Sequence, residues 1–219
     1  LHNMRTIKSI KQEDKKNRIA QETMEIYAPL ADRMGMHRIR DELEDLSFEI
    51  LNLEARQLIQ NRLNEIKKDK EDIFDSSSVE IKNLLDKNNV NAKIFGREKT
   101  PFSIWRKLQK KRVSLELITD IIGFRIILDN VDDCYHTLGL LHKKWNCIPG
   151  KFKDYISSPK INSYKSLHTS IIGPYKKPVE IQIRTSEMHD FAERGIASHW
   201  KYKSSEKFNS LNWKEYDWL

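Results

Sequence analysis

The chain has 219 residues, of which 38% are hydrophobic and 32% charged, a balance typical of a helix-rich α/β protein with solvated helical faces. No stretch reaches the roughly 18–20 apolar residues of a membrane span, and no leader peptide opens the sequence, so we expect a cytoplasmic protein with no membrane partner. Cys134 and Cys147 are too few for a disulfide framework and lack metal-site spacing. The formal net charge of +7 predicts anionic partners, and nucleic acid and polyphosphate nucleotides both qualify.

The first third of the sequence has the periodicity of helices. An apolar stripe predicts a helix over 12–33, which Pro29 should end or kink, and Gly35 permits a turn after it. A long amphipathic helix is expected to follow and to continue to Lys68. The run FDSSS at 74–78 interrupts this pattern and is the best linker candidate. We therefore expect a helical module over 1–72, with the catalytic residues after it.

Strands and helices alternate in the rest of the chain. We expect helices over 79–87, 134–145 and 186–199, and strands over 91–95, 118–128, 167–172 and 179–185. Thr100 is placed to cap a further helix that begins at Pro101, and a long polar loop precedes the strand over 167–172. This alternation predicts an α/β sheet layered with helices over 73–203, followed by a C-terminal tail over 204–219.

The segment VEIQIR alternates strictly between apolar and polar residues. One strand face therefore carries Glu180, Gln182 and Arg184, and such a face is often only solvated. Asp120 heads the most apolar strand and is either a strand-end residue or a Mg²⁺ ligand, because hard cations prefer carboxylate oxygens. If the two strands share one sheet, Asp120 and Glu180 would converge on one or two ions.

Arg125 complicates this arrangement. Alternation puts it on the strand face opposite Asp120, so both residues serve one site only if Gly123 marks a bulge or Asp120 swings in from the strand end.

A basic segment precedes and opens the helix that begins at Pro101. Arg97 and Lys99 lie before the helix, while Ser103 and Lys107 are four residues apart on one helical face. Free N–H groups at the helix start, the serine hydroxyl and the cations together would form a cradle for a triphosphate. The alternative is a solvated basic helix.

The loop KFKDYISSPKINSYKSLHT combines cations with aromatic rings. Lysine beside tyrosine suits a nucleotide, with the phosphate bound by lysine and the base stacked on tyrosine, although single-stranded nucleic acid would use the same composition. The residues concerned are Lys151, Lys153, Lys160, Lys165, Tyr155, Tyr164 and His168. His168, His189 and His199, each taken alone, are more often hydrogen-bonding residues of the fold.

Together these segments resemble the RelA/SpoT family of guanosine tetra- and pentaphosphate synthetases. The likeness runs through GREKTPFSIWRKLQ, TDIIGFRIIL, IPGKFKDYISSPKINSYKSLHT, GPYKKPVEIQIRTSEMH and AERGIASHWKYK, in the family's order, and is dense over 94–203. The segment YAPLADRMGMHRIRDELEDLSFEIL is similar to the helical connector of long members. The resemblance implies a nucleotidyltransferase-like mixed β-sheet flanked by helices, and an enzyme that uses Mg²⁺ to transfer pyrophosphate from ATP to the 3′-hydroxyl of GDP or GTP.

The resemblance also implies roles for individual residues. The ATP phosphates would be bound by Arg97, Lys99, Ser103 and Lys107, and Arg125, helped by Arg97, would flank the adenine. Asp120 would bind Mg²⁺, and Glu180 would share that ion or activate the acceptor hydroxyl. The acceptor nucleotide would be bound by Tyr164, which stacks on guanine, by Lys153 and Lys160 at its phosphates, and by His168, Gln182 and His189.

Three departures from the family pattern qualify these implications. The metal-binding residues of hydrolase-active members would lie upstream, where only LHNMRT is present, so we expect part of a longer protein without (p)ppGpp hydrolysis. Ser163 stands where the family usually has glycine, so the loop is strained if that residue needs a positive φ. The sequence ends at Leu219 without regulatory domains, so ribosome contact is not expected. The basic KFKD motif resembles that of bifunctional members more than that of monofunctional synthetases.

Two alternatives to an active synthetase remain. One is a catalytically silent remnant that binds guanine nucleotide or a partner protein. The other is a nucleic-acid-binding module, which predicts strongly salt-dependent binding but leaves the two carboxylates unexplained, so nucleic acid is not expected as a specific partner. The sequence leaves the oligomeric state and the preference between GDP and GTP open.

Overall fold

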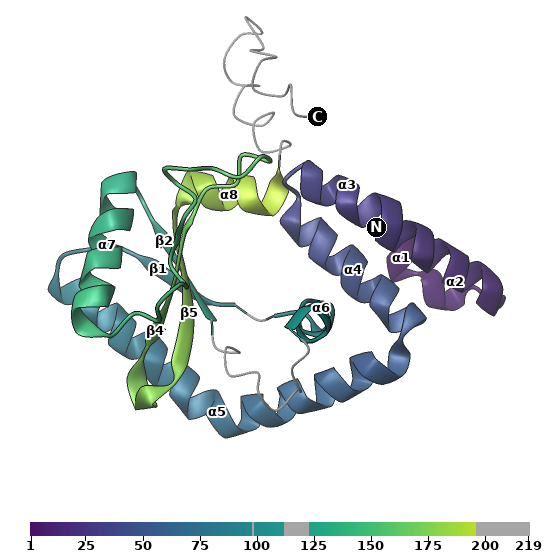
Figure 1. Cartoon of the computed structure of the whole chain (residues 1–219), viewed down its shortest axis with the longest axis horizontal. Helices are drawn as coiled ribbons and strands as arrows, with labels where there is room; N and C mark the ends of the chain where they lie inside the picture. Colours follow the sequence, from purple (N-terminus) through teal and green to yellow (C-terminus); the bar gives the residue numbers. More distant parts are fainter. Residues whose placement is uncertain (98, 112–122, 196–219) are drawn as a thin grey trace, which may run out of the picture.

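The N-terminal helices form a small bundle (Figure 1). The computed structural model describes residues 1–97, 99–111 and 123–195. The bundle contains α1 (His2–Arg5), η1 (Ile7–Ser9), α2 (Glu13–Glu22), η2 (Thr23–Tyr27), α3 (Ala28–Arg33) and α4 (His37–Leu51). A buried apolar cluster holds these elements together, with Met4, Ile7, Ala20, Ala28, Ala31 and Leu43 at its centre.

Pro29 does not end the helix in which it lies. The helical backbone continues to Arg33, and the turn just before the proline, η2, is a π-helix. A proline ring crowds the carbonyl group four residues before it, and the wider π turn is a usual way to accommodate such a misfit. Gly35 then reverses the chain with a φ of 71°, which confirms the predicted turn.

The long helix expected through Lys68 breaks at Asn52 instead. Asn52 has an extended φ of −151°, and its side chain accepts a hydrogen bond from the Ala55 N–H at 3.3 Å, which starts α5 (Leu53–Lys87). The linker expected at 74–78 is also wrong, because α5 runs through it without interruption. Ser77 is buried and Phe74 stacks on Phe124 at 4.8 Å, so packing against the sheet overrides the low helix propensity of the serines.

The described residues contain one mixed sheet of five strands in the order β1-β2-β5-β4-β3. The strands are β1 (Lys93–Gly96), β2 (Gly123–Leu128), β3 (Lys153–Asp154), β4 (Leu167–Ile172) and β5 (Pro178–Thr185). β2 and β5 are parallel, and the other neighbouring pairs are antiparallel. The predicted mixed sheet flanked by helices is thus confirmed. The part of the predicted strand at 118–122 lies outside the described residues, and β3 was not predicted.

Helices cover both faces of the sheet (Figure 1). α7 (Val131–Lys144) and the C-terminal part of α5 pack on the apolar face, where Phe124, Ile126, Ile181 and Ile183 are fully buried. On the polar face lie α8 (Ser186–Arg194), α4 and α6 (Pro101–Lys111), and η4 (Pro174–Lys176) connects β4 to β5. α8 ends at Arg194, where Gly195 takes a φ of 63°. The predicted continuation over 196–199 and the predicted C-terminal tail lie outside the described residues.

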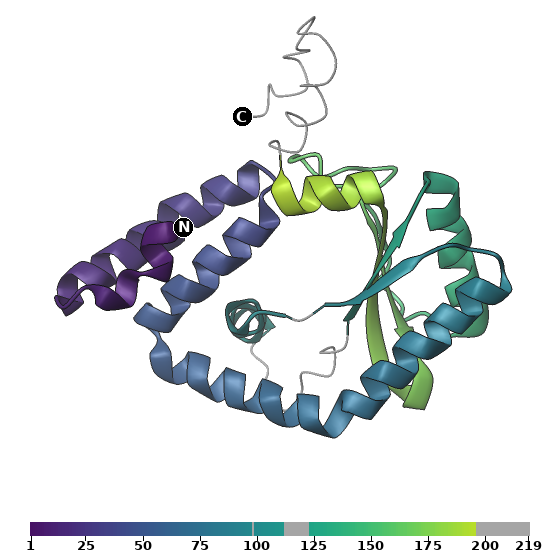
Figure 2. The same cartoon turned by 180° about the vertical axis from the view of Figure 1, so that it is seen from behind.

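α5 joins the two parts of the molecule, as the view from behind shows (Figure 2). Near its start, Ile59 and Leu63 pack with Phe48 of α4 and with Phe102 of α6. Near its end, Ile81 and Leu85 belong to the core of the sheet. The predicted module boundary at residue 72 therefore falls inside a continuous helix. No helix in the described part of the chain is long and apolar enough to cross a membrane.

Candidate functional site

The polar face of the sheet brings several predicted site residues into one row. The strand register pairs Arg125 with Gln182, Gln182 with His168, and His168 with Lys153. Because side chains on paired positions of neighbouring strands share a face, these four residues lie on the same side of the sheet. The predicted alternation in β5 is confirmed, since its apolar residues are fully buried on the opposite side.

Glu180 lies in the next row, beside two cations. Its Oε1 is 2.9 Å from Arg97 Nη1, and its Oε2 is 2.9 Å from Lys99 Nζ. Burial raises the pKa of Glu180, but Lys99 and then Arg97 outweigh it, so the pKa lies below its usual value and the carboxylate is ionised at neutral pH. The register partner of Glu180 is Gly123 of the parallel neighbour β2. Asp120 lies outside the described residues.

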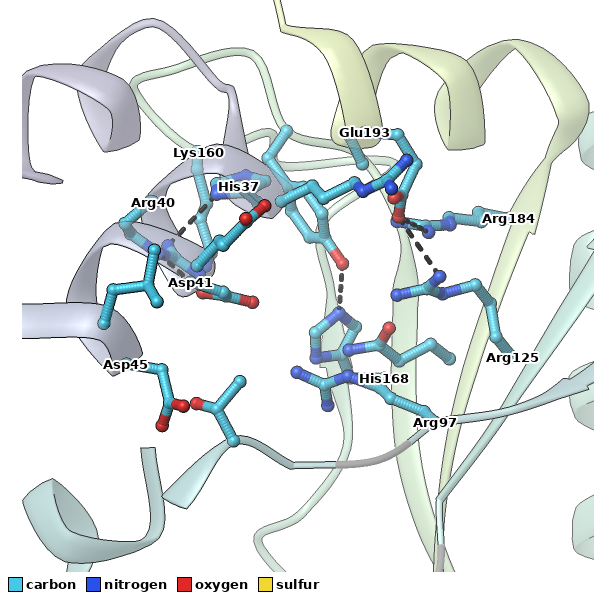
Figure 3. Close-up of a pocket in the computed structure, with 17 residues that line it drawn as sticks. His37, Arg40, Asp41, Asp45, Arg97, Arg125, Lys160, His168, Arg184 and Glu193 are labelled. Atoms are coloured by element: carbon cyan, nitrogen blue, oxygen red, sulfur yellow. Dashed lines mark hydrogen bonds and ion pairs between the residues drawn. The ribbon is translucent and has the colours of Figure 1, made fainter. Parts of the chain in front are cut away.

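A cavity of about 540 Å³ opens between this face of the sheet and α4 (Figure 3). The predicted residues that line it are Arg97, Arg125, Lys160, Tyr164, His168 and Gln182. The predicted residues that do not line it are Lys99, Ser103, Lys107, Lys153, Glu180 and His189. Lys99 nevertheless lies close to the cavity. It forms an ion pair with Glu180, and Glu180 forms a second ion pair with Arg97, which lines the cavity.

Two arginines of the cavity wall share one carboxylate. Arg125 Nη1 and Arg184 Nη2 lie 3.1 Å and 3.4 Å from the same Glu193 Oε1, and Arg184 also contacts His189 Nδ1 at 2.7 Å. The Arg184 side chain is only 2% exposed, and burial, reinforced by Arg125, lowers its pKa to about 10. Burial also lowers the pKa of Arg125, although Glu193 opposes the shift. Two guanidinium groups on one carboxylate leave an excess of positive charge, which suits an anionic ligand.

Arg184 and Glu193 were not predicted as site residues. The alternation in β5 placed Arg184 on the polar face, which was the available signal. Glu193 gave none, because its position on α8 becomes meaningful only once that helix is placed over the sheet.

Tyr164 is the centre of an aromatic cluster on the other side of the cavity. Its hydroxyl group lies 2.8 Å from His168 Nε2, and Lys160 Nζ lies 5.0 Å from its ring centroid and 4.9 Å from that of Tyr155. Burial lowers the pKa of Lys160 and lowers that of His168 to about 3, so His168 is neutral. Ser163 has a φ of 58°, which confirms that this position needs the left-handed conformation.

The start of α6 differs from the predicted phosphate cradle. Thr100 caps the helix as expected, because its Oγ1 accepts a hydrogen bond from the Ser103 N–H at 3.3 Å. The Phe102 N–H, however, donates to Asp45 Oδ1 at 3.3 Å, and the Ser103 hydroxyl donates to the Thr100 carbonyl at 2.8 Å. The N–H groups of Phe102 and Ser103, which were expected to be free, are therefore bonded, the first to a carboxylate of α4 and the second to the Thr100 cap.

α4 contributes a whole wall of the cavity that was not predicted. Figure 3 shows Arg40, Asp41 and Asp45 opposite His168 and Arg97. His37 also lines the cavity, and the spacing of 37, 41 and 45 places these residues on one helical face. This polar face is visible in the sequence, but nothing in the sequence indicates that it meets the sheet.

Comparisons with known proteins agree with this geometry. The family model described as "Region found in RelA / SpoT proteins" matches residues 96–207, just over half of the chain, and a model described as "HD domain" matches residues 1–37. The GTP pyrophosphokinase rsh of Brucella melitensis is 45% identical over 224 residues, which cover 100% of this chain and 30% of that protein. A Haemophilus influenzae protein named guanosine-3′,5′-bis(diphosphate) 3′-pyrophosphohydrolase is 44% identical over 209 residues, covering 95% of this chain and 31% of that protein.

The fold has solved counterparts. Small alarmone synthetase 1 from Bacillus subtilis, bound to its product pppGpp, aligns with a TM-score of 0.51 and 23% identity, covering 72% of this chain and 88% of that one.

A mixed sheet with a cation-rich cavity on its polar face defines an α/β domain suited to an anionic ligand. More specifically, the chain belongs to the RelA/SpoT family, since the family match runs from the last residue of β1 through α8 and includes most of the cavity wall. The chain spans 30% of the length of the Brucella relative, so the activity of the whole protein is a matter for proposal.

Proposed function

We propose that this chain is a (p)ppGpp synthetase, which transfers the pyrophosphate group of ATP to the 3′-hydroxyl of GDP or GTP and releases AMP. The observation that carries the proposal is the family match over 96–207, because it coincides with the cavity where basic residues gather beside an ionised carboxylate. Catalysis of this kind of transfer depends mainly on positioning and charge neutralisation, and a cation-rich cavity supplies both.

The donor nucleotide is proposed to lie towards the β1–α6 segment. Arg97 and Lys99 would turn from Glu180 to the ATP phosphates, and Ser103 and Lys107 on α6 would complete the phosphate contacts. Arg125, in the same cavity as Arg97, would flank the adenine ring. Because the α6 N–H groups are bonded in this structure, the side chains of this segment carry the proposed binding.

Mg²⁺ is the proposed cofactor, and Glu180 fits the role of one of its ligands. The described residues contain no group of three or more His, Cys, Asp or Glu side chains that could hold a metal by themselves. Mg²⁺ in nucleotide enzymes, however, is usually bound by one or two carboxylates together with substrate phosphates. Glu180 is ionised, and Asp120 is proposed as the second ligand. Bound there, the ion would neutralise charge on the phosphate oxygens.

The acceptor nucleotide is proposed to lie against Tyr164, with its guanine stacked on the ring. Lys160, beside that ring, and Lys153, on the neighbouring strand β3, would neutralise its phosphates. His168, Gln182 and His189 would contact the nucleotide from the sheet and α8. Glu180 is then the proposed acceptor of the 3′-hydroxyl proton, since a carboxylate that stays ionised at neutral pH is available as a base.

A product assay tests the proposal directly. With γ-labelled ATP, GDP or GTP and Mg²⁺, we expect a labelled 3′-pyrophosphorylated guanosine and AMP, and no product from Asp120→Asn or Glu180→Gln. The exposed control Asp190→Asn, on α8, should retain full activity. Guanine nucleotide binding without any product from the unaltered chain would instead support a catalytically silent binding module. The same mixture with ppGpp as substrate tests the predicted absence of hydrolysis. This measurement is needed because the Haemophilus influenzae relative is named a pyrophosphohydrolase.

A further inference from the structure

Three aromatic side chains surround Tyr164 in the described part of the chain. Tyr155 and His168 approach its ring edge-on, with centroid distances of 6.1 Å and 5.7 Å, and both belong to the same chain region as Tyr164. The third and closest ring is that of His37, at 5.1 Å and an interplanar angle of 81°. His37 is the first residue of α4 and comes from the helical bundle, far from Tyr164 in the sequence.

The side chains of Arg40 and Asp32 contact the imidazole of His37. Its Nδ1 lies 3.1 Å from Arg40 Nη1 and 3.3 Å from Asp32 Oδ1, and depending on the tautomer it accepts from the Arg40 N–H or donates to the Asp32 carboxylate. In either tautomer one hydrogen bond restrains the imidazole. Its Nε2 is buried and has no hydrogen-bond partner among the described residues. An unpaired buried nitrogen is unfavourable. The interaction at Nδ1 and the packing against Tyr164 must offset this cost for the ring to keep its orientation.

The turn that carries His37 also docks on the loop that carries Tyr164. Asn162 Nδ2 donates a hydrogen bond to the Asp32 carbonyl at 2.9 Å. A Cβ added at Gly35 would lie 3.6 Å from the Asn162 carbonyl and 3.4 Å from the Cα of Gly195, so these backbones are in contact. The position of this loop is thus set in part by the helical bundle.

We propose that His37 is a positioning residue for Tyr164, and that the helical bundle thereby sets the affinity for the acceptor nucleotide. The inference rests on the proposed function, in which Tyr164 stacks on guanine. Edge-to-face contact with His37 and the hydroxyl contact with His168 restrain the Tyr164 ring at two points, so that it needs no ordering when a base binds. Removal of the His37 ring should weaken binding of GDP and leave binding of ATP unchanged.

Three substitutions of His37 separate the effect of its aromatic ring from the effect of its Nδ1 contacts. His37→Phe keeps an aromatic edge against Tyr164 and loses the Nδ1 contacts, whereas His37→Asn keeps a polar group near Arg40 and loses the ring. His37→Ala loses both. We expect the Asn and Ala variants to raise the KM for GDP about fivefold to tenfold with the KM for ATP unchanged, and the Phe variant to stay within about twofold of the unaltered chain. The control His136→Ala, exposed on α7, should change neither constant.

Equilibrium binding of a fluorescent GDP analogue, measured without ATP, separates this inference from the proposed function. If the unaltered chain binds the analogue but makes no product, the synthetase proposal fails and the affinities of the His37 variants still decide the inference. Unchanged GDP affinity in His37→Ala, or an equal loss of GDP and ATP affinity, would overturn it. Weakening by Phe as strong as that by Ala would also overturn it, because the ring would then not be the feature that matters.

Discussion

Glu193 is the carboxylate on which the two arginines of the cavity wall depend, and its neutralisation should be costly. Glu193→Gln keeps a hydrogen-bond acceptor but removes the negative charge that both Arg125 and the almost fully buried Arg184 contact. Removing one partner of a fully buried ion pair costs about 3–5 kcal/mol. The Glu193 and Arg125 side chains are 28% and 24% exposed, and Arg184 keeps its contact with His189, so we expect about 2 kcal/mol.

Thermal unfolding followed by circular dichroism measures this cost. For a chain of this size about 2 kcal/mol corresponds to a decrease in Tm of roughly 4–8 °C. Millimolar pyrophosphate should raise the Tm of Glu193→Gln more than that of the unaltered chain, because an anion in the cavity replaces the missing charge. Asp190→Asn on the exposed side of the same helix is the matched control. A Tm change below about 1 °C, or an equal change in the control, would refute the reasoning.

The remaining predictions concern pH, strain and close packing. Burial holds the pKa of His168 at about 3, below its unfolded value of about 6.5, so the stability that neutral His168 contributes is present above pH 6.5 and is lost as the pH falls towards 3. Denaturant unfolding should show a loss of about 2 kcal/mol at pH 5, and His168→Gln should remove that part of the pH dependence. Ser163→Gly should stabilise the fold by about 0.5–1 kcal/mol in urea unfolding because the left-handed conformation no longer strains a side chain, whereas the same change at exposed Ser158 should not stabilise. Gly195→Ala should lower the Tm by several degrees, since its Cβ would lie 2.2 Å from the Met34 carbonyl, while Gly139→Ala, with nothing within 4 Å, should raise it slightly.

The secondary structure was predictable where local signals and tertiary packing agree. The alternation in β5 and the Thr100 cap on α6 both held, because each depends on residues close together in the sequence. The prediction failed at Asn52. The apolar periodicity on both sides of this residue favoured one continuous helix, whereas in the structure Asn52 caps the start of α5. The prediction failed again at 74–78, which stays helical because Phe74 stacks on Phe124 of a strand formed much later in the chain.

The candidate site was predicted in part for a similar reason. Arg97, Tyr164 and His168 lie in or beside motifs that are dense in charge and aromatic rings, and all three line the cavity. The wall formed by α4 was missed because nothing in its own sequence indicates which helix face meets the sheet. The carboxylate of Asp45 likewise reaches the start of α6 only through the tertiary fold. Long-range contacts of this kind have no local signature.

α5 has a consequence for how the two walls of the cavity are spaced. Its 35 residues extend about 52 Å, from the break at Asn52 that ends α4 to the core of the sheet. No loop within α5 could absorb a change in its length. One residue inserted in its middle would advance the far end by about 1.5 Å and rotate it by about 100°, which would turn Ile81 and Leu85 away from the strands they cover. Insertions and deletions should therefore be tolerated in the surface loops and excluded from this helix, whose residue count determines the width of the space between α4 and the sheet.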